Sequence, residues 1–417
     1  MNKGVNRFLR VFPWYAGLTG DLLFYIAVDT LFLTLVKNFS PAQIVSITSL
    51  SQLACIALQF PVLFVIKKIG NTASVRVGAF SLLLSAILIA FGKNYYVVLI
   101  GKIFHDISLI FKSASIVALE NNLDLLDRRC DFVHYRTSAN TVYAVITMLI
   151  SFVASYMFNL NPYLPMIGCI TTCAFGFVLS LLMKDCSGYN KIKRESRSGV
   201  RVKIHYNKII IIAIILYAFF YSLVGNGQGE GKLFIQQNIL LDFDAEQTAL
   251  IIGAIICASR IIRVVSNVIF EKLYKKYLDK MGVALPILLG ASIAFMLFGS
   301  FVPHVITKII VMSAGYAIIL FIRDPFKLYI QDAIFASTPK EQHQTLLTTL
   351  EFGVKVATAG IGLSFSAILL SYPMLVVMAI MFAISLTVIV LSVILYRTIM
   401  AGKSQSKDKT FVKRLTD

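Results

Sequence analysis

Long apolar segments alternate with short polar connections along the chain. Most of them reach the length of about 20 residues that an α-helix needs to cross a lipid bilayer. The pattern predicts twelve spanning helices, at residues 12–36, 41–66, 72–92, 95–119, 137–159, 162–183, 208–240, 245–270, 281–301, 305–333, 344–371 and 373–397. The expected fold class is therefore all-α: a polytopic integral membrane protein with both termini on the same side.

Composition agrees with this pattern. Of the 417 residues, 58% are hydrophobic and 14% charged, and the mean hydropathy is +0.79. A soluble protein of this length needs more charge to cover its surface. No small-residue cleavage site follows the first apolar segment, so we expect it to be a retained helix and not a signal peptide.

Basic residues are distributed unevenly between the two sides. Loops on the side of the termini hold 28 of the 39 Lys and Arg residues, whereas the opposite loops hold only Lys37 and Lys93. Because basic loops stay in the cytoplasm, we expect both termini there, in a multi-pass protein of the cell membrane, the cytoplasmic (inner) membrane of a bacterium. The net charge of +18 is then a topology signal. It is secondarily a contact for anionic lipid, and no nucleic-acid partner is expected.

A polar, basic segment divides the chain into halves. Residues 184–207 contain few large apolar side chains, which is typical of a linker. The sequence predicts a six-helix bundle over residues 1–183, this linker, a second six-helix bundle over 208–399, and a cytoplasmic tail over 400–417.

The halves also repeat each other weakly. A shift of 204 positions places "SPAQIVSI", from Ser40, on "DAEQTALI", from Asp244. Ser and Asp are both good N-cap residues, so each should begin a helix. Such a repeat is typical of transporters built from two similar bundles.

The six-plus-six arrangement, the basic central loop and the loop after the second span of each half resemble the major facilitator superfamily. That loop in the family has the pattern G-x-x-x-D-R-x-G-R-R. In the second half, Glu271 and Lys272 match its Asp-Arg, although Tyr274 replaces glycine. In the first half Gly70 fits, but Lys67 stands where the acid belongs. The resemblance implies the fold and transport by alternating access, and it identifies no subfamily.

Charged residues inside predicted spans need a reason, because each costs several kcal/mol unless it has a partner or faces a cavity. In the first span Asp21, Tyr25 and Asp29 are spaced by four, so they should share one helix face. Two carboxylates on one face suit proton or cation handling. The alternative for Asp29 is that it reaches the outer interface.

The fourth span carries Lys102, His105 and Asp106 on one face. A mid-membrane His beside an Asp suits a proton relay. A neutralised Lys102–Asp106 pair is an equally good interpretation.

The tenth span carries Arg323, Asp324 and Lys327 around Pro325, which should kink the helix. The two basic side chains could bind a carboxylate or phosphate. The alternative is an Arg–Asp pair that sets a cytoplasmic gate. We expect Arg263, in the eighth span, to extend toward the interface.

The stretch "LVGNGQGEGKLF" has glycine at every second position from Gly225 to Gly231. It lacks the spacing of a phosphate-binding loop. A helix from Lys208 to Leu240 would be about 50 Å long at ~1.5 Å per residue, so we expect these glycines to mark a bend or unwound turn. The polar residues between them would then line a cavity; the alternative is an extracellular loop.

These residues together predict a secondary active transporter for a small polar, anionic or zwitterionic organic solute, coupled to protons, monomeric, and without cofactor or metal. The lipid bilayer and the solute are its expected partners. The predicted substrate-binding residues are Tyr25, Lys102, Asn226, Gln228, Arg323 and Lys327. The predicted proton-coupling residues are Asp21, Asp29, His105, Asp106 and Glu230. The predicted gating residues are Gly225, Gly227, Gly229, Gly231, Glu271, Lys272, Asp324 and Pro325.

Three alternatives stay open. The 31 Phe and 18 Tyr residues would suit a drug or amphiphile efflux antiporter, although the mid-membrane basic residues argue against it. A lipid flippase of the same fold would need a lateral opening. A membrane enzyme would need nucleophile–base or metal-ligand spacing, which the sequence does not show.

The orientation can be tested at Ser198, in the basic linker. A cysteine introduced there should react with a membrane-impermeant reagent only after the cells are opened, because basic loops stay in the cytoplasm. Labelling in intact cells would reverse the whole topology.

Overall fold

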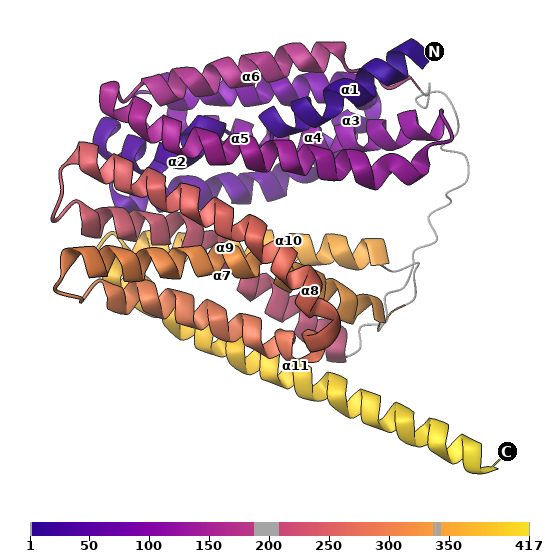
Figure 1. Ribbon diagram of the computed structural model, residues 1–417. Coiled ribbons are helices and arrows are strands. Elements are labelled where there is room, and N and C mark those ends of the chain that lie inside the picture. The colour runs from indigo at the N-terminus through magenta and orange to yellow at the C-terminus, as the bar shows by residue number, and fades with distance from the viewer. Residues whose placement is uncertain (1, 187–207, 337, 339–342, 417) are drawn as a thin grey trace. The chain divides into compact units, whose positions relative to one another are not determined.

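The computed structural model describes residues 2–186, 208–336, 338 and 343–416; within the helices, the side chains of some segments, 270–279 and 401–416 among them, lie outside this description. In the described part every regular element is helical (Figure 1). The elements are α1 (Asn2–Leu18), α2 (Leu23–Leu31), the π-helix η1 (Phe32–Val36), α3 (Pro41–Phe91), α4 (Tyr95–Asp124), the 3-10 helix η2 (Arg129–Asp131), α5 (Phe132–Leu160), α6 (Leu164–Leu182), α7 (Lys208–Ile239), α8 (Ala245–Gly299), α9 (Val305–Ala336), α10 (His343–Ile368) and α11 (Met374–Thr416).

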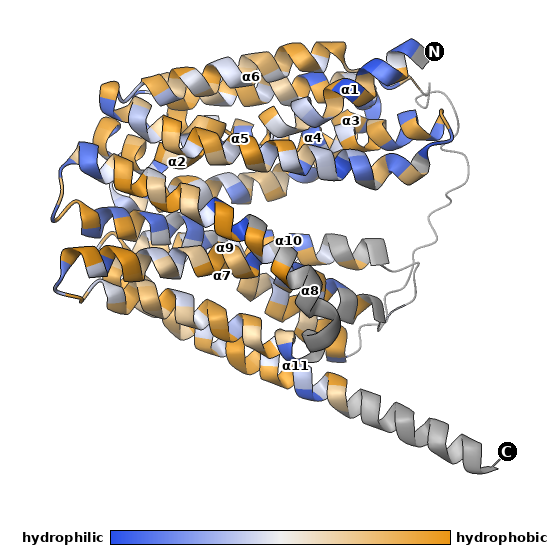
Figure 2. Ribbon diagram, viewed as in Figure 1, coloured by the Kyte–Doolittle hydropathy of each residue, from blue (hydrophilic) through white to orange (hydrophobic). Residues whose placement is uncertain are grey.

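The helices cover the predicted spans, although α3 and α8 each contain two of them and the first span is divided, and this confirms the all-α membrane fold. Nine helical segments of the described chain are long and apolar enough to cross a membrane. Figure 2 shows one of them, α6, as predominantly hydrophobic along its length. The 51-residue α3 contains two predicted spans, joined at Gly70, whose φ of 81° lies in the left-handed region that glycine tolerates. The glycine matched to the family pattern is therefore the one that turns the chain.

The chain divides into two compact units. One comprises Met1–Val200 with Ile239–Ile261, and the other comprises Arg201–Asn238 with Ile262–Asp417. The predicted linker lies almost wholly in residues 187–207, outside the described residues, so the predicted domain boundaries stay a prediction. The predicted tail, residues 400–417, continues helix α11 as far as Thr416.

Helix α1 forms much of the core of the first unit. Its apolar side chains pack against residues of α3, α4 and α5, in a buried cluster of Val5, Phe8, Leu9, Phe12, Tyr15, Val75, Ala79, Ala114, Ala118, Leu119, Leu123, Ala139 and Met183. The small residues of α3 and α4 let the aromatic rings of α1 fit between the helices. This packing fixes the position of the residues that follow α1.

The predicted helix N-caps of the two related segments are confirmed. Ser40 begins α3 with a reciprocal capping box, in which the Gln43 amide donates to the Ser40 hydroxyl and the Gln43 side chain accepts from the Ser40 N–H. The Gln247 amide donates to the Asp244 carboxylate at 2.8 Å, at the start of α8. Both helices therefore begin with the same local chemistry, 204 positions apart.

The first span is not the continuous helix that the pattern predicted. Helix α1 ends at Leu18 and α2 begins at Leu23, so Asp21 lies in a break and does not share a helix face with Tyr25 and Asp29. Just before the break the chain packs closely against α5, since a Cβ at Gly17 would lie 2.6 Å from Val142. The break frees the Ala16 carbonyl, which accepts a hydrogen bond from the Lys112 ammonium at 2.8 Å. Irregular backbone at membrane depth is tolerated where such partners are supplied.

The unwound turn that we expected at Gly225–Gly231 is wrong. Helix α7 runs unbroken from Lys208 to Ile239. Gly227 is buried, and a Cβ there would lie 2.7 Å from Ile319, whereas a Cβ at Gly229 would have nothing within 4 Å. Gly227 therefore permits close approach of α9. The helix stays intact because tertiary packing outweighs the ~1 kcal/mol that each glycine costs in a helix.

These two glycines predict opposite responses to alanine. Gly229→Ala should stabilise the protein by up to about 1 kcal/mol, because it improves helix propensity without a clash. Gly227→Ala should gain nothing or lose stability, because Ile319 must move. Thermal melting of both purified variants measures the difference, and equal melting temperatures would contradict this account of α7.

Candidate functional site

A histidine between two carboxylates forms the centre of the polar cluster in the first unit. Nε2 of His105 lies 2.7 Å from an Asp21 carboxylate oxygen, and Nδ1 lies 2.9 Å from an Asp106 carboxylate oxygen. The His105 side chain is only 4% exposed. Helix α4 supplies His105 and Asp106, and the break after α1 supplies Asp21, so the irregular backbone places a carboxylate where a continuous helix would not.

Lys102 gives this cluster a second arrangement. Its ammonium lies 3.1 Å from Nδ1 of His105 and 3.7 Å from an Asp106 carboxylate oxygen. A neutral imidazole that donates from Nε2 to Asp21 can accept at Nδ1 from Lys102. An imidazolium instead donates to both carboxylates. One proton therefore exchanges a Lys102–His105 hydrogen bond for a His105–Asp106 hydrogen bond.

The three residues predicted to share a face of α4 are thus brought together, and Asp21 joins them. Tyr25 is buried in α2, and its ring belongs to the packed interior of the first unit. Asp29 accepts a hydrogen bond from the Thr30 amide at 2.6 Å, one turn beyond Tyr25 on α2. The proton-handling role of Asp29 and the binding role of Tyr25 stay predictions.

In the second unit, α7 and α9 meet at Arg323. Its guanidinium donates to the Gln228 side-chain oxygen at 3.3 Å, and its backbone carbonyl accepts from the Tyr221 hydroxyl. Pro325 lies two residues further along α9 and lacks the N–H that would bond the Phe321 carbonyl. The Ser266 hydroxyl donates to that carbonyl instead. Side chains of α7 and α8 thus satisfy carbonyl groups around the proline within a helix that continues through it.

Ion pairs around Arg323 differ from those that we expected. Arg263 does not extend to the interface but binds Asp324 through two hydrogen bonds, of 2.8 and 3.1 Å. Asp324 therefore has a partner on α8. Lys327 binds Glu351 of α10 at 2.8 Å, so a bound anion would have to compete with that carboxylate. The Arg263–Asp324 pair is bidentate, and this geometry requires the two N–H groups of a guanidinium, which explains the arginine at position 263.

The polar residues of α7 are more buried than a cavity lining requires. Asn226, Glu230 and Lys232 are each 5% exposed. In the described residues, one carboxylate oxygen of Glu230 and the amide nitrogen atoms of Asn226 and Gln228 have no hydrogen-bond partner. Buried polar atoms of this kind mark places where a ligand or water is expected. Their roles stay predictions.

Two predicted gating residues cannot be placed in the same detail. Glu271 and Lys272 belong to α8, but their side chains lie outside the described residues. Within the part of the chain that is described, no group of three or more His, Cys, Asp or Glu side chains is arranged to hold a metal ion.

Sequence reasoning missed the contacts that connect distant segments. Asp21 and His105 are 84 positions apart, and Arg263 and Asp324 are 61 apart. The signal for the first was the pair of glycines, Gly17 and Gly20, just before Asp21. The signal for the second was that Arg263 and Asp324 are charged residues of opposite sign within predicted spans, where each needs a partner.

Comparison with solved structures shows that this chain shares its fold with membrane transporters, which is the fold that the resemblance to the major facilitator superfamily implied. A mutant of the nucleoside transporter NupG matches with a TM-score of 0.72 and 10% identity, over 95% of this chain and 99% of its own. A bacterial homologue of the iron transporter ferroportin, in an inward-facing state, matches with a TM-score of 0.69 and 13% identity, over 95% and 99%. A bacterial metal transporter matches with a TM-score of 0.63 and 14% identity, over 94% and 98%.

No protein-family model matches the sequence, and no curated protein matches it. The fold resemblance is thus confirmed from structure, at sequence identities that leave the solute to be argued from the residues.

The Arg263–Asp324 pair predicts a stability effect. Arg263→Gln should destabilise the protein by about 1–3 kcal/mol, because it removes both hydrogen bonds from the Arg263 guanidinium to the Asp324 carboxylate at a site that is partly shielded from water. The charge-swapped double variant, Arg263→Asp with Asp324→Arg, should recover at least half of the loss. Melting of the purified proteins measures both. A single variant as stable as the parent would show that the pair contributes nothing.

Proposed function

We propose that this protein is a secondary active transporter that moves a small polar, anionic or zwitterionic organic solute by alternating access, coupled to protons. The observation that supports this proposal most directly is that His105 lies between Asp21 and Asp106, beside Lys102. In this proposal the chain is a monomer in the cell membrane, with both termini in the cytoplasm.

Charge balance supports the coupling. With His105 neutral, the cluster of Lys102, Asp21 and Asp106 has one positive and two negative charges, for a net charge of −1. One added proton makes it neutral. Since a net charge is costly to bury in a membrane, gain and loss of this proton changes the free energy of the conformations that bury the cluster. A transporter can use such a difference to link a proton gradient to its conformational change.

The basic side chains support the solute class. Lys102 and Arg323 lie among buried polar groups, and a guanidinium or an ammonium recognises carboxylate or phosphate oxygens. Asn226, Gln228 and Tyr25 would supply neutral hydrogen bonds. Lys327 would bind the solute after it has left its ion pair with Glu351. NupG transports nucleosides, which are also polar organic solutes. The other two solved structures are a homologue of the iron transporter ferroportin and a metal transporter, so their names point to metal ions and not to an organic solute.

The proposed gate combines small and charged residues. The glycines Gly225, Gly227, Gly229 and Gly231 let α7 change its packing without unwinding. Asp324, Pro325, Glu271 and Lys272 would act on the cytoplasmic side of the moving helices. Glu230 and Asp29 are secondary candidates for proton transfer.

The second candidate is an efflux antiporter for drugs or amphiphiles, or a lipid flippase, of the same fold. The aromatic pairs of the second unit favour it, since Phe220 and Phe326 stack with ring centroids 3.7 Å apart, and Tyr217 and Tyr221 lie 4.5 Å apart. Raised cellular resistance to lipophilic cations on expression would favour this candidate over the first.

Proton coupling is tested in liposomes that contain the purified protein. A thermal-shift screen against a metabolite library first identifies a stabilising solute, because a ligand that binds the folded state raises its melting temperature. Uptake of that solute should rise at least 10-fold with an imposed pH gradient. Asp21→Asn and His105→Gln should remove this acceleration while solute exchange without a gradient continues.

The control is His134→Gln, which removes an exposed histidine of α5 outside the cluster. It should keep the response of the parent. Loss of exchange together with gradient-driven uptake in both cluster variants would assign the residues to solute binding. Full gradient-driven uptake in them would contradict the proposed coupling.

A further inference from the structure

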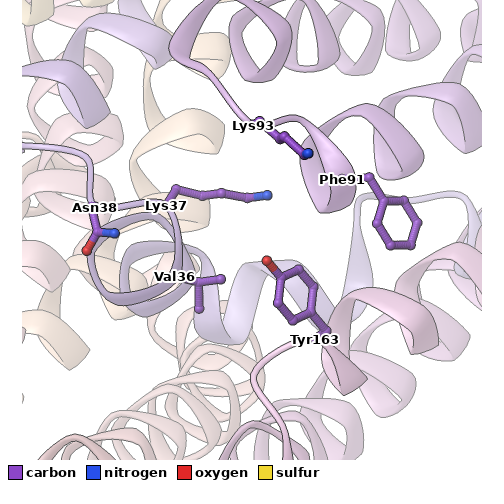
Figure 3. A pocket seen from close by; sticks show the side chains of 6 residues that line it. All are labelled: Val36, Lys37, Asn38, Phe91, Lys93 and Tyr163. Carbon is purple, nitrogen blue, oxygen red and sulfur yellow. The ribbon is translucent and has the colours of Figure 1, made fainter.

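A cavity of about 540 Å³ opens at the end of the first unit opposite the N-terminus, and it is separate from the His105 cluster. Figure 3 shows its lining, which comprises Val36, Lys37, Asn38, Phe91, Lys93 and Tyr163. Three segments contribute: the end of η1 with the chain that follows it, the end of α3 with its connection to α4, and the residue before α6. None of the six lining side chains carries a negative charge.

Lys37 is held in place with its charge uncompensated. Its ammonium donates to the carbonyl groups of Ala90 and Gly92, at 2.7 and 2.8 Å. It also lies 5.1 Å from the ring centroid of Phe32 and 5.7 Å from that of Tyr163. Two of its three N–H groups are thus used, and one stays available. Partial burial lowers the pKa of Lys37 from its usual value, a cost that a bound anion would offset.

Lys93 adds a second positive charge to the same cavity. It is exposed, and in the described part of the chain neither Lys93 nor Lys37 pairs with a carboxylate. They are also the only two basic residues in the predicted loops of this side. Two like charges in a small volume repel each other unless an anion lies between them.

Backbone and hydroxyl donors complete the set. Helix α4 begins at Tyr95, two residues after Lys93, and α6 begins at Leu164, next to Tyr163. The N-terminal ends of both helices therefore lie at this cavity, where their positive dipole ends favour an anion. In Figure 3 the Tyr163 hydroxyl and the Lys37 ammonium point toward the same space. That hydroxyl has no hydrogen-bond partner among the described residues.

We propose that this cavity binds a phosphate group, held by Lys37, Lys93 and the Tyr163 hydroxyl. Two sources share this chemistry. One is the headgroup of an anionic phospholipid. The exposed aromatic rings of Phe91 and Tyr96 agree with this source, since aromatic residues gather at membrane–water interfaces. The other is a phosphorylated solute in the water outside. The site is independent of the proposed proton coupling.

Binding to the purified full-length protein in neutral detergent tests the site. The probes are inorganic phosphate and a short-chain phosphatidylglycerol, with phosphatidylcholine of equal chain length as the zwitterionic control, and isothermal titration measures the affinity. Lys93→Gln should weaken binding at least 5-fold, because it removes a charge without a structural contact. Tyr163→Phe should weaken it 2- to 5-fold, because it removes one hydroxyl and keeps the ring.

The matched control is Lys67→Gln, which removes an exposed lysine in the middle of α3, next to the turn at Gly70. Its affinity should stay within 2-fold of the parent. Binding of both phosphate and phosphatidylglycerol assigns a site open to soluble ligands, and binding of phosphatidylglycerol alone assigns a headgroup site. No binding of either probe, or equal losses in Lys93→Gln and Lys67→Gln, would overturn the proposal.

Discussion

The cost of placing charge in a bilayer governs this structure. His105 lies between Asp21 and Asp106, with Lys102 beside it, because each of these groups alone would be expensive at membrane depth. Together they are nearly neutral and hydrogen-bonded. The same arrangement gives Nδ1 of the imidazole two partners, Lys102 and Asp106. Whether His105 is protonated determines which of these two hydrogen bonds forms.

The same constraint explains how the helices tolerate their breaks and prolines. The end of α1 leaves the Ala16 carbonyl free, and Lys112 reaches it from α4. Pro325 leaves the Phe321 carbonyl free, and Ser266 reaches it from α8. Since the bilayer offers no water to these carbonyl groups, a neighbouring helix must supply the donor. Each irregular segment is thereby tied to one particular neighbour.

The two units use the fold differently. In the first, the charged residues converge on one histidine. In the second, they separate into the pairs Arg263–Asp324 and Lys327–Glu351 around an arginine that faces Gln228. A weak repeat thus preserves helix order and capping, whereas the charged residues have diverged. Under the function proposed above, the first half would handle protons and the second would recognise the solute.

The sequence by itself determined the spanning helices, the caps at Ser40 and Asp244 and the turn at Gly70, because hydrophobic length, capping and backbone conformation are local properties. It also placed Lys102, His105 and Asp106 on one face, since helix geometry fixes that spacing. Only the tertiary structure decided that the first span breaks at Asp21 and that α7, despite four glycines, does not. Those outcomes depend on which helix packs alongside, and the local sequence does not tell which distant segment that helix is.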